Sequence, residues 1–159
     1  MITVKITVEK YVAEYIQGKY FDHEADAVRF PSDLDIYVLI YDLLQRRPVD
    51  RPVDTGNLNF TLPERRLGKD PATYNYLSGK SQKILGDKMR LMMWAELHDL
   101  MDENKHLKGI QFKETVYTFM RRYSIESISE DALLKNYQRW RYKLRRKQKR
   151  GYVRKTSSF

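Results

Sequence analysis

Residues 111–150, QFKETVYTFMRRYSIESISEDALLKNYQRWRYKLRRKQKR, predict two helices joined by a short polar turn. In the first helix, apolar side chains recur at helical spacing on one face, namely Phe112, Val116, Phe119 and Met120. Ser127 and Glu130 have the spacing of a capping box, and Ser129 is an equally good N-cap because two acidic residues follow it. We therefore expect the second helix to begin near Ser129 and to end at Gly151, since glycine favours helix ends.

The second helix has two faces of different chemistry. Apolar side chains at spacings of four, three and four form one stripe, which consists of Leu133, Tyr137, Trp140 and Leu144. A second stripe is polar and basic, and consists of Lys135, Gln138, Arg139, Tyr142, Arg145, Arg146 and Lys149. We expect the apolar stripe to pack inward, with Trp140 in the core rather than stacked on a base, and the basic stripe to face a negatively charged partner.

The positive charge of the chain is concentrated at one end. The sequence has 30 basic and 21 acidic residues, which gives a net charge of +9. Residues 132–159 hold 11 of the basic residues and no acidic one, so the preceding part has 19 basic and 21 acidic residues. This asymmetry favours a polyanionic partner such as nucleic acid. The alternatives are a solvated helix face, a tail that aids solubility, an acidic protein and a membrane surface.

The composition limits the class of protein. A chain of 159 residues with 42% apolar and 13% aromatic content can form one compact core or two small subdomains. The absence of cysteine excludes disulfides, thiolate zinc sites and cysteine nucleophiles. No apolar run approaches the roughly 18 residues of a membrane span, and the first residues lack the pattern of a signal peptide. We therefore expect a cytoplasmic protein with no membrane partner.

The first part of the chain predicts strands and short helices. Residues 2–8, ITVKITV, alternate as a half-buried strand does, and residues 9–21 have helical spacing with Gly18 placed to end the helix. Residues 26–31 and residues 57–63 predict two further strands, the latter by its alternation. These segments together favour a small three-stranded sheet covered by helices.

Residues 31–47, PSDLDIYVLIYDLLQRR, predict a helix that is apolar nearly all round. Ser32 is the expected N-cap, and Arg46 and Arg47 lie near the negative end of the helix dipole. Such a helix is either sandwiched in the core or donates a face to another subunit, and the second alternative suggests a homodimer. The doubled tetrapeptide RPVDRPVD, residues 47–54, then excludes a helix because of its prolines.

The chain after residue 66 predicts helices alone. Asp70 and Pro71 favour a helix start, and residues 71–109 indicate either one helix broken near Ser78 and Gly79 or two helices. The predicted fold is α+β and mostly helical. It has three parts, which are a small α/β subdomain over residues 1–66, a helical subdomain over residues 67–150 and a basic flexible tail over residues 151–159.

Two polar segments raise the alternative of an enzyme. Residues 21–27, FDHEADA, could hold the metal of a nuclease, but a polar turn between helix and strand explains them better. Glu103 and His106 have the Glu-x-x-His form of half a carboxylate-bridged metal site, but no second copy exists, which favours a solvated helix face. Phosphate-binding glycine loops and the common hydrolase motifs are absent from the sequence. We therefore expect no enzyme, no catalytic or metal-binding residue, no cofactor and no small-molecule substrate.

The helix pair resembles a helix-turn-helix, with residues 112–125 as the supporting helix and residues 129–147 as the recognition helix. It departs from that pattern because the segment between the helices is longer than three or four residues and has no glycine. Together with the α/β front half, it looks like small uncharacterised proteins of bacterial prophages and other mobile elements. This resemblance implies DNA rather than RNA as the ligand, and a regulator or accessory factor of a mobile element as the function.

The sequence thus predicts a nucleic-acid-binding protein whose ligand is duplex DNA. Phosphate contacts are expected from five side chains, which are Lys135, Arg139, Arg145, Arg146 and Lys149. Gln138 or Arg139 would read bases, Tyr142 would stack on a base or bond a phosphate, and Arg154 and Lys155 in the tail would either order on nucleic acid or fray. The alternative is a non-enzymatic interaction or structural module whose basic helix docks on an acidic partner.

Overall fold

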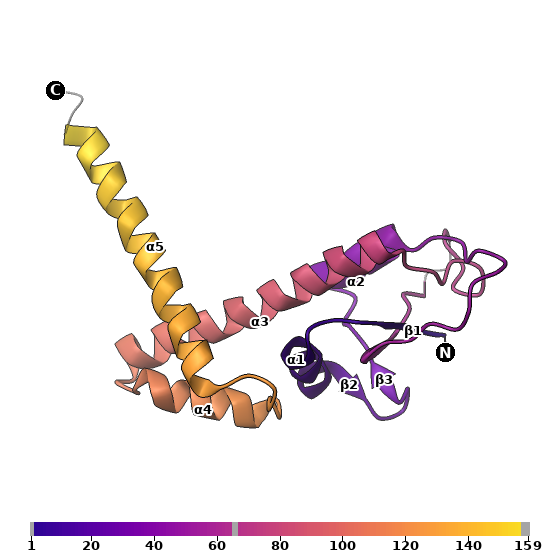
Figure 1. Cartoon of the computed structure of the whole chain (residues 1–159), viewed down its shortest axis with the longest axis horizontal. Coiled ribbons are helices and arrows are strands. Elements are labelled where there is room, and N and C mark those ends of the chain that lie inside the picture. The colour runs from indigo at the N-terminus through magenta and orange to yellow at the C-terminus, as the bar shows by residue number, and fades with distance from the viewer. Residues whose placement is uncertain (1, 65–66, 157–159) are drawn as a thin grey trace.

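The computed structural model describes the backbone of residues 2–64 and 67–156, and side chains as far as Gln148. Within these residues the chain forms five helices and one four-stranded sheet, so the predicted α+β and mostly helical class is confirmed. Figure 1 shows the sheet and α2 toward one end of the molecule, α4 and α5 at the other, and α1 between them. The long helix α3 connects the two ends.

The sheet has the strand order β1-β4-β3-β2. β1 (Thr3–Ile6) pairs antiparallel with β4 (Leu58–Thr61), β4 pairs parallel with β3 (Ala27–Val28), and β3 pairs antiparallel with β2 (Phe21–Asp22). The prediction of three strands was one short. β2 has only two residues and follows a helix directly, so no alternation of apolar and polar residues marks it.

The helix α1 (Lys10–Tyr20) continues through Gly18, so the prediction that this glycine ends the helix was wrong. The reason is close packing. A Cβ atom at Gly18 would lie 2.5 Å from the backbone oxygen of Tyr123, in the segment that joins α4 and α5. Glycine is therefore placed here for the approach of two backbones, not for a turn.

The helix α2 (Asp35–Leu43) is shorter than predicted at both ends. Leu34, not Ser32, is the N-cap residue, and it makes no side-chain hydrogen bond to the helix. The two arginines lie beyond the last turn, where Arg47 instead forms an ion pair of 2.6 Å with Asp54. This pair links the two copies of the tetrapeptide and holds the proline-rich loop against the fold.

The segment before α3 is a turn, so the prediction of a helix from Asp70 was wrong. The Asp70 carboxylate does accept a hydrogen bond from the backbone of Ala72, as a cap would. The chain then extends, and Tyr76 pairs with Gln45 in an isolated β-bridge. The helix begins only after Ser78, whose hydroxyl accepts a hydrogen bond from the Ser81 amide.

The helix α3 (Gly79–Leu107) is the spine of the molecule. It ends as predicted beside Gly109, which has a positive φ of 66°. Five of its apolar side chains are completely buried, namely Leu85, Met89, Met93, Leu97 and Met101. Because α3 packs against α1, α2 and α4, the apolar residues of both halves form one continuous core. The predicted boundary near residue 66 stays a prediction.

The last two helices are α4 (Phe112–Arg122) and α5 (Glu130–Thr156). The helix pair is therefore present, and the Ser129 hydroxyl accepts a hydrogen bond from the Ala132 amide, which confirms Ser129 as the N-cap. The prediction that α5 ends at Gly151 was wrong, since the helix continues to Thr156. Lys149, Arg154 and Lys155 belong to this helix, but their side chains lie outside the described residues.

Candidate nucleic-acid interface

The segment that joins α4 to α5, residues 123–129, is held by the front half of the molecule. The Glu14 carboxylate of α1 accepts hydrogen bonds of 3.0 Å from the backbone amides of Glu126 and Ser127. Tyr123 and Ile125 at its beginning are buried at 8% and 3% exposure. This segment is longer than the usual helix-turn-helix turn. It is still fixed in place, because α1 supplies the acceptors for two of its backbone amides.

A polar cluster strengthens this junction. Glu96 of α3 accepts hydrogen bonds from the Lys19 ammonium at 2.8 Å and from the Tyr123 hydroxyl at 2.9 Å. Burial and the hydrogen bond to Glu96 raise the pKa of Tyr123 above its ordinary value, so its hydroxyl stays protonated as a donor. The cluster joins α1, α3 and the turn at one point, and so fixes where α5 starts.

The first turns of α5 are anchored in the core. Leu133 and Tyr137 are exposed by 0% and 1%, and the Tyr137 ring lies 4.9 Å from that of Phe112. The Tyr137 hydroxyl donates a hydrogen bond to the Asp102 carboxylate of α3. Burial and this hydrogen bond raise the pKa of Tyr137 to about 12. The prediction that the apolar stripe packs inward is therefore confirmed for its first two residues, Leu133 and Tyr137.

One turn further, α5 contacts α3 through aromatic rings. The His98 ring of α3 stacks on that of Trp140 with centroids 4.5 Å apart and planes at 28°. Its Nε2 lies 3.0 Å from the Oδ1 atom of Asn136, which makes the Nε2–H tautomer the donor. Burial lowers the pKa of His98, so the ring is neutral near pH 7.

Beyond this contact, α5 leaves the body of the protein. Leu144 was expected to pack inward, but 42% of its surface is exposed, so this prediction was wrong. Every side chain from Tyr142 to Gln148 is exposed. Figure 1 shows the reason: α5 rises away from α3 and α4, and its C-terminal half has no neighbouring element in the view. The apolar stripe of the sequence extends to Leu144, but α3 and α4 pack against it only as far as Trp140.

The structure places the described members of the predicted basic stripe on the exposed surface of α5, and these are Lys135, Gln138, Arg139, Tyr142, Arg145 and Arg146. Lys135 forms an ion pair of 2.9 Å with Asp131 one turn earlier. Arg139, Arg145 and Arg146 form no ion pair with any described residue. Exposed cations without a carboxylate partner remain available for phosphates, which is the property that the stripe was predicted to have.

Two basic residues outside the predicted stripe are also exposed on α5, and these are Lys143 and Lys147. The signal that could have identified them is the complete absence of acidic residues after Asp131. Arg141 differs, because it is half-buried, with its guanidinium 5.8 Å from the centre of the Phe112 ring and 3.5 Å from the Tyr137 hydroxyl. It therefore supports the fold.

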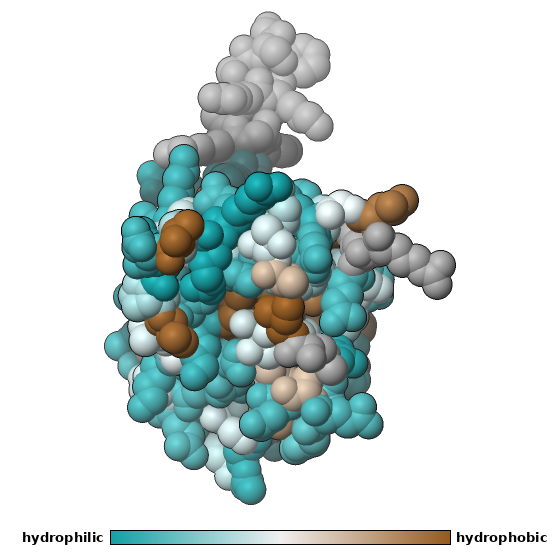
Figure 2. All heavy atoms as spheres, turned by 90° about the vertical axis from the view of Figure 1, so that its right-hand side faces the viewer, coloured by the Kyte–Doolittle hydropathy of each residue, from teal (hydrophilic) through white to brown (hydrophobic). Residues whose placement is uncertain are grey.

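Two described arginines of the front half, Arg46 and Arg47, contact polar side chains of the same half. Arg46 donates a hydrogen bond to the Tyr74 hydroxyl, and Arg47 is held by Asn75 and by its ion pair with Asp54. Figure 2 views this end of the molecule, where the coloured surface is mostly hydrophilic and the apolar side chains stand in small separate groups. Among the described residues of this end, Lys5, Arg47 and Arg51 line one shallow pocket together with Asp54, which pairs with Arg47.

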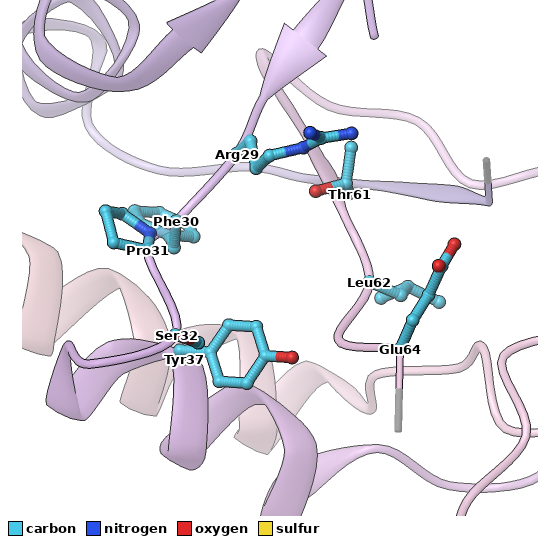
Figure 3. Close-up of a pocket in the computed structure, with 8 residues that line it drawn as sticks. All are labelled: Arg29, Phe30, Pro31, Ser32, Tyr37, Thr61, Leu62 and Glu64. Atoms are coloured by element: carbon cyan, nitrogen blue, oxygen red, sulfur yellow. The ribbon is translucent and has the colours of Figure 1, made fainter. Parts of the chain in front are cut away.

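A hollow of about 410 Å³ lies beside the sheet. Figure 3 shows Arg29 and Thr61 on one side of it, while the Tyr37 ring extends from α2 toward the segment that carries Glu64. Arg29 forms an ion pair of 3.3 Å with Asp22. The described residues that line the hollow include the hydroxyl side chains of Ser32 and Thr61, and no histidine.

The described residues offer neither a metal site nor a membrane-spanning helix. Among the described residues, no three histidine, aspartate or glutamate side chains lie together as ligands for a metal ion. Asp22, for example, accepts a hydrogen bond from the backbone of Glu24 within the turn that precedes β3. In the same part of the chain, no helix combines the length and the apolar character needed to cross a membrane. Comparisons of the chain with protein-family models, curated proteins and solved structures found no match.

Proposed function

We propose that this protein binds nucleic acid, and duplex DNA in particular, through the basic face of α5. The observation that carries this proposal is the projection of α5 from the body. Five cations between Arg139 and Lys147 are exposed and form no ion pair with a described residue, and these are Arg139, Lys143, Arg145, Arg146 and Lys147. A helix kept only for solubility would not need Tyr137, Asn136 and Trp140 to anchor it at a defined place on α3. The anchored first half and the free second half together make a fixed arm with a high density of positive charge.

The dimensions of the arm suit a DNA groove. An α-helix with its side chains is about 10–12 Å wide, and the major groove of B-DNA is about 12 Å wide. The projecting part, Tyr142 to Thr156, is about 22 Å long at 1.5 Å per residue, which is roughly two-thirds of one turn of DNA. Because the body ends before this part begins, the arm can enter the groove without a collision between the body and the duplex.

The side chains divide into two roles. Lys135, Arg139, Arg145, Arg146 and Lys149 contact phosphates and supply most of the affinity. Either Gln138 or Arg139, which both lie on the exposed side of the anchored half, reads base edges, so Arg139 is a candidate for either role, and Tyr142 stacks or bonds a phosphate. Arg154 and Lys155 extend the same charge to the end of the helix. The resemblance to proteins of prophages and mobile elements extends the proposal to a cytoplasmic regulator or accessory factor of such an element.

The test is duplex binding measured by fluorescence anisotropy over a series of salt concentrations. Each phosphate contact contributes about −0.9 to the slope of log K against log salt. A variant with Arg139, Arg145 and Arg146 changed to alanine should therefore lose about 2.7 units of slope and bind more weakly at low salt. The matched control replaces three exposed lysines of the remainder of the chain, Lys5, Lys80 and Lys83, and should keep the slope.

Two results would contradict the proposal. If the intact protein does not bind duplex DNA at low salt, DNA binding by α5 is wrong. If the two triple variants lose the same amount of slope, the affinity follows net charge and not the α5 surface.

One observation favours the alternative function, an acidic protein partner. Leu144 and Trp140 put an apolar edge beside the cations of α5, and an acidic amphipathic helix could cover both. A protein of this kind would be retained poorly on heparin and would not shift random duplexes at moderate salt. A DNA-binding protein should do both.

A further inference from the structure

A groove of about 550 Å³ lies between α3 and α5, at the base of the projecting arm. This volume is within the range of sites that take small organic groups. Its walls contain Trp94 and Trp140, which are the only two tryptophans of the sequence. Between them lies His98, whose ring is tilted by 34° from that of Trp94 and by 28° from that of Trp140. Three aromatic rings in mutual contact, two from α3 and one from α5, therefore form the floor of the groove.

The polar groups of the groove differ between its two helices. Arg139 and Lys143 line the α5 side, both are exposed, and neither forms an ion pair with a described residue. Asp99 lines the α3 side. A phosphate is thus attracted to α5 and repelled by α3, which gives a bound nucleotide one orientation, with its base toward α3 and its phosphate toward α5.

Asn136 adds a group that can contact the edge of a base. Its Oδ1 atom is occupied by the Nε2–H of His98 at 3.0 Å. Its amide Nδ2 has no acceptor among the described residues, and the side chain lines the groove. The amide can therefore donate a hydrogen bond to a carbonyl oxygen of a base that stacks on the neighbouring rings.

Other occupants fit the groove less well. A second copy of α5 is opposed by charge, because residues 132–159 contain 11 basic and no acidic residues. An uncharged apolar helix would leave Arg139 and Lys143 without partners at the rim of a partly desolvated site. A nucleotide satisfies the aromatic wall and the cations with one ligand.

We propose that this groove binds an unpaired nucleotide, so that the protein prefers junctions between duplex and single-stranded DNA to continuous duplex. The inference depends on the proposed function, since the duplex part of the junction is held by α5. Arg139 connects the two sites, because it lies both on the exposed basic face and at the edge of the groove. A strand whose phosphates follow α5 is thereby directed to place its next base between the helices.

The experiment compares a blunt duplex with the same duplex carrying a thymidine overhang. Affinity is measured by anisotropy of a dye on the DNA, and occupancy of the groove by the tryptophan emission of the intact protein, since both tryptophans line the site. Stacking of one base contributes roughly a factor of ten in affinity. We therefore expect about tenfold tighter binding of the overhang and a quenching of tryptophan emission that the blunt duplex does not produce.

A blocking variant and a matched control locate the effect. Leu91 lines the groove and is 63% exposed, so Leu91→Glu places a carboxylate in the site without emptying the core. This variant should bind the overhang only as tightly as the blunt duplex, and should bind the blunt duplex within twofold of the wild type. Val49→Glu makes the same change of charge at a loop residue that is 99% exposed, and should keep the preference for the overhang.

The possible results separate the two proposals. Equal binding of both DNAs with equal tryptophan emission overturns the groove inference and leaves duplex binding by α5 in place. Absence of binding to either DNA overturns both. Quenching by a polyglutamate peptide that Leu91→Glu abolishes, without quenching by the overhang, assigns the groove to an acidic protein and also overturns the inference.

Discussion

The substitution Gly18→Ala tests how the front half of the molecule fixes the position of α5. Alanine in the middle of a helix is normally more stable than glycine by about 1 kcal/mol. At Gly18, however, the added Cβ would lie 2.5 Å from the backbone oxygen and 2.7 Å from the Cα atom of Tyr123. Both are backbone atoms, so no side chain can rotate away to make room.

The magnitude follows from the movement that the new atom requires. An ordinary Cβ contact begins near 3.4 Å, so α1 and the turn must separate by about 1 Å. This separation lengthens the two hydrogen bonds from Glu126 and Ser127 to Glu14, which are now 3.0 Å each. Overpacking of this kind costs about 1–3 kcal/mol, and hydrogen bonds to a charged group contribute about 1.5–3 kcal/mol each. After the helix-propensity gain, we expect a net loss of about 2 kcal/mol in the free energy of unfolding.

The assay is urea unfolding followed by far-ultraviolet circular dichroism. With a slope of about 2 kcal/mol per molar urea, a loss of 2 kcal/mol lowers the midpoint by about 1 M. Gly86→Ala is the matched control, since it is also a glycine inside a helix, but its Cβ would meet only a methyl group of Val8 at 3.4 Å. That variant should be as stable as the wild type or more stable by up to about 1 kcal/mol. A Gly18→Ala protein that unfolds at or above the wild-type midpoint would refute the proposed backbone contact.

Two further predictions concern His98 and the oligomeric state. Because burial lowers the pKa of His98, the unfolded state binds a proton first as the pH falls below about 6.5, so stability is lost from there down to the pKa of the folded state. The urea midpoint should thus fall more between pH 7.5 and pH 5.5 for the wild type than for His98→Gln. An equal fall in both proteins would show that His98 does not cause the loss of stability. If the protein is a homodimer that pairs two basic helices, as the apolar sequence of α2 suggests, sedimentation at high concentration should give twice the monomer mass. The apolar surface available on α2 is limited, because Ile36 and Ile40 are buried and Val38, at 43%, is the one exposed apolar residue of this helix. A strictly monomeric profile would exclude this dimer.

The sequence could predict those elements in which local pattern and tertiary environment agree. The alternation of Val4 with Ile6 and of Leu58 with Phe60 corresponds to two paired strands whose apolar side chains are buried. Ser129 was identified as an N-cap because its role depends only on the next three residues. The errors have a different origin: Gly18 is placed for a contact with Tyr123, more than 100 residues away, which no local pattern contains.

The same distinction applies to the candidate interface. The exposure of Arg145 and Arg146 follows from helical spacing and from the absence of acidic neighbours, so both could be identified from the sequence. The exposure of Leu144 could not be predicted, because helical spacing alone does not show where the packing of α5 against α3 ends. The groove also required the structure, since it combines Trp94 and Trp140 from helices separated by α4.

The division of α5 into an anchored half and a projecting half has a consequence for how the sequence can change. Substitutions at Leu133 or Tyr137 alter the core and are constrained by folding, whereas those from Tyr142 to Gln148 replace exposed side chains. Surface changes of this kind usually alter stability by less than about 0.5 kcal/mol. One continuous helix therefore separates the residues that selection must keep for folding from those that it can exchange freely. Under the proposed function, the specificity of the arm could diverge without a change in the fold.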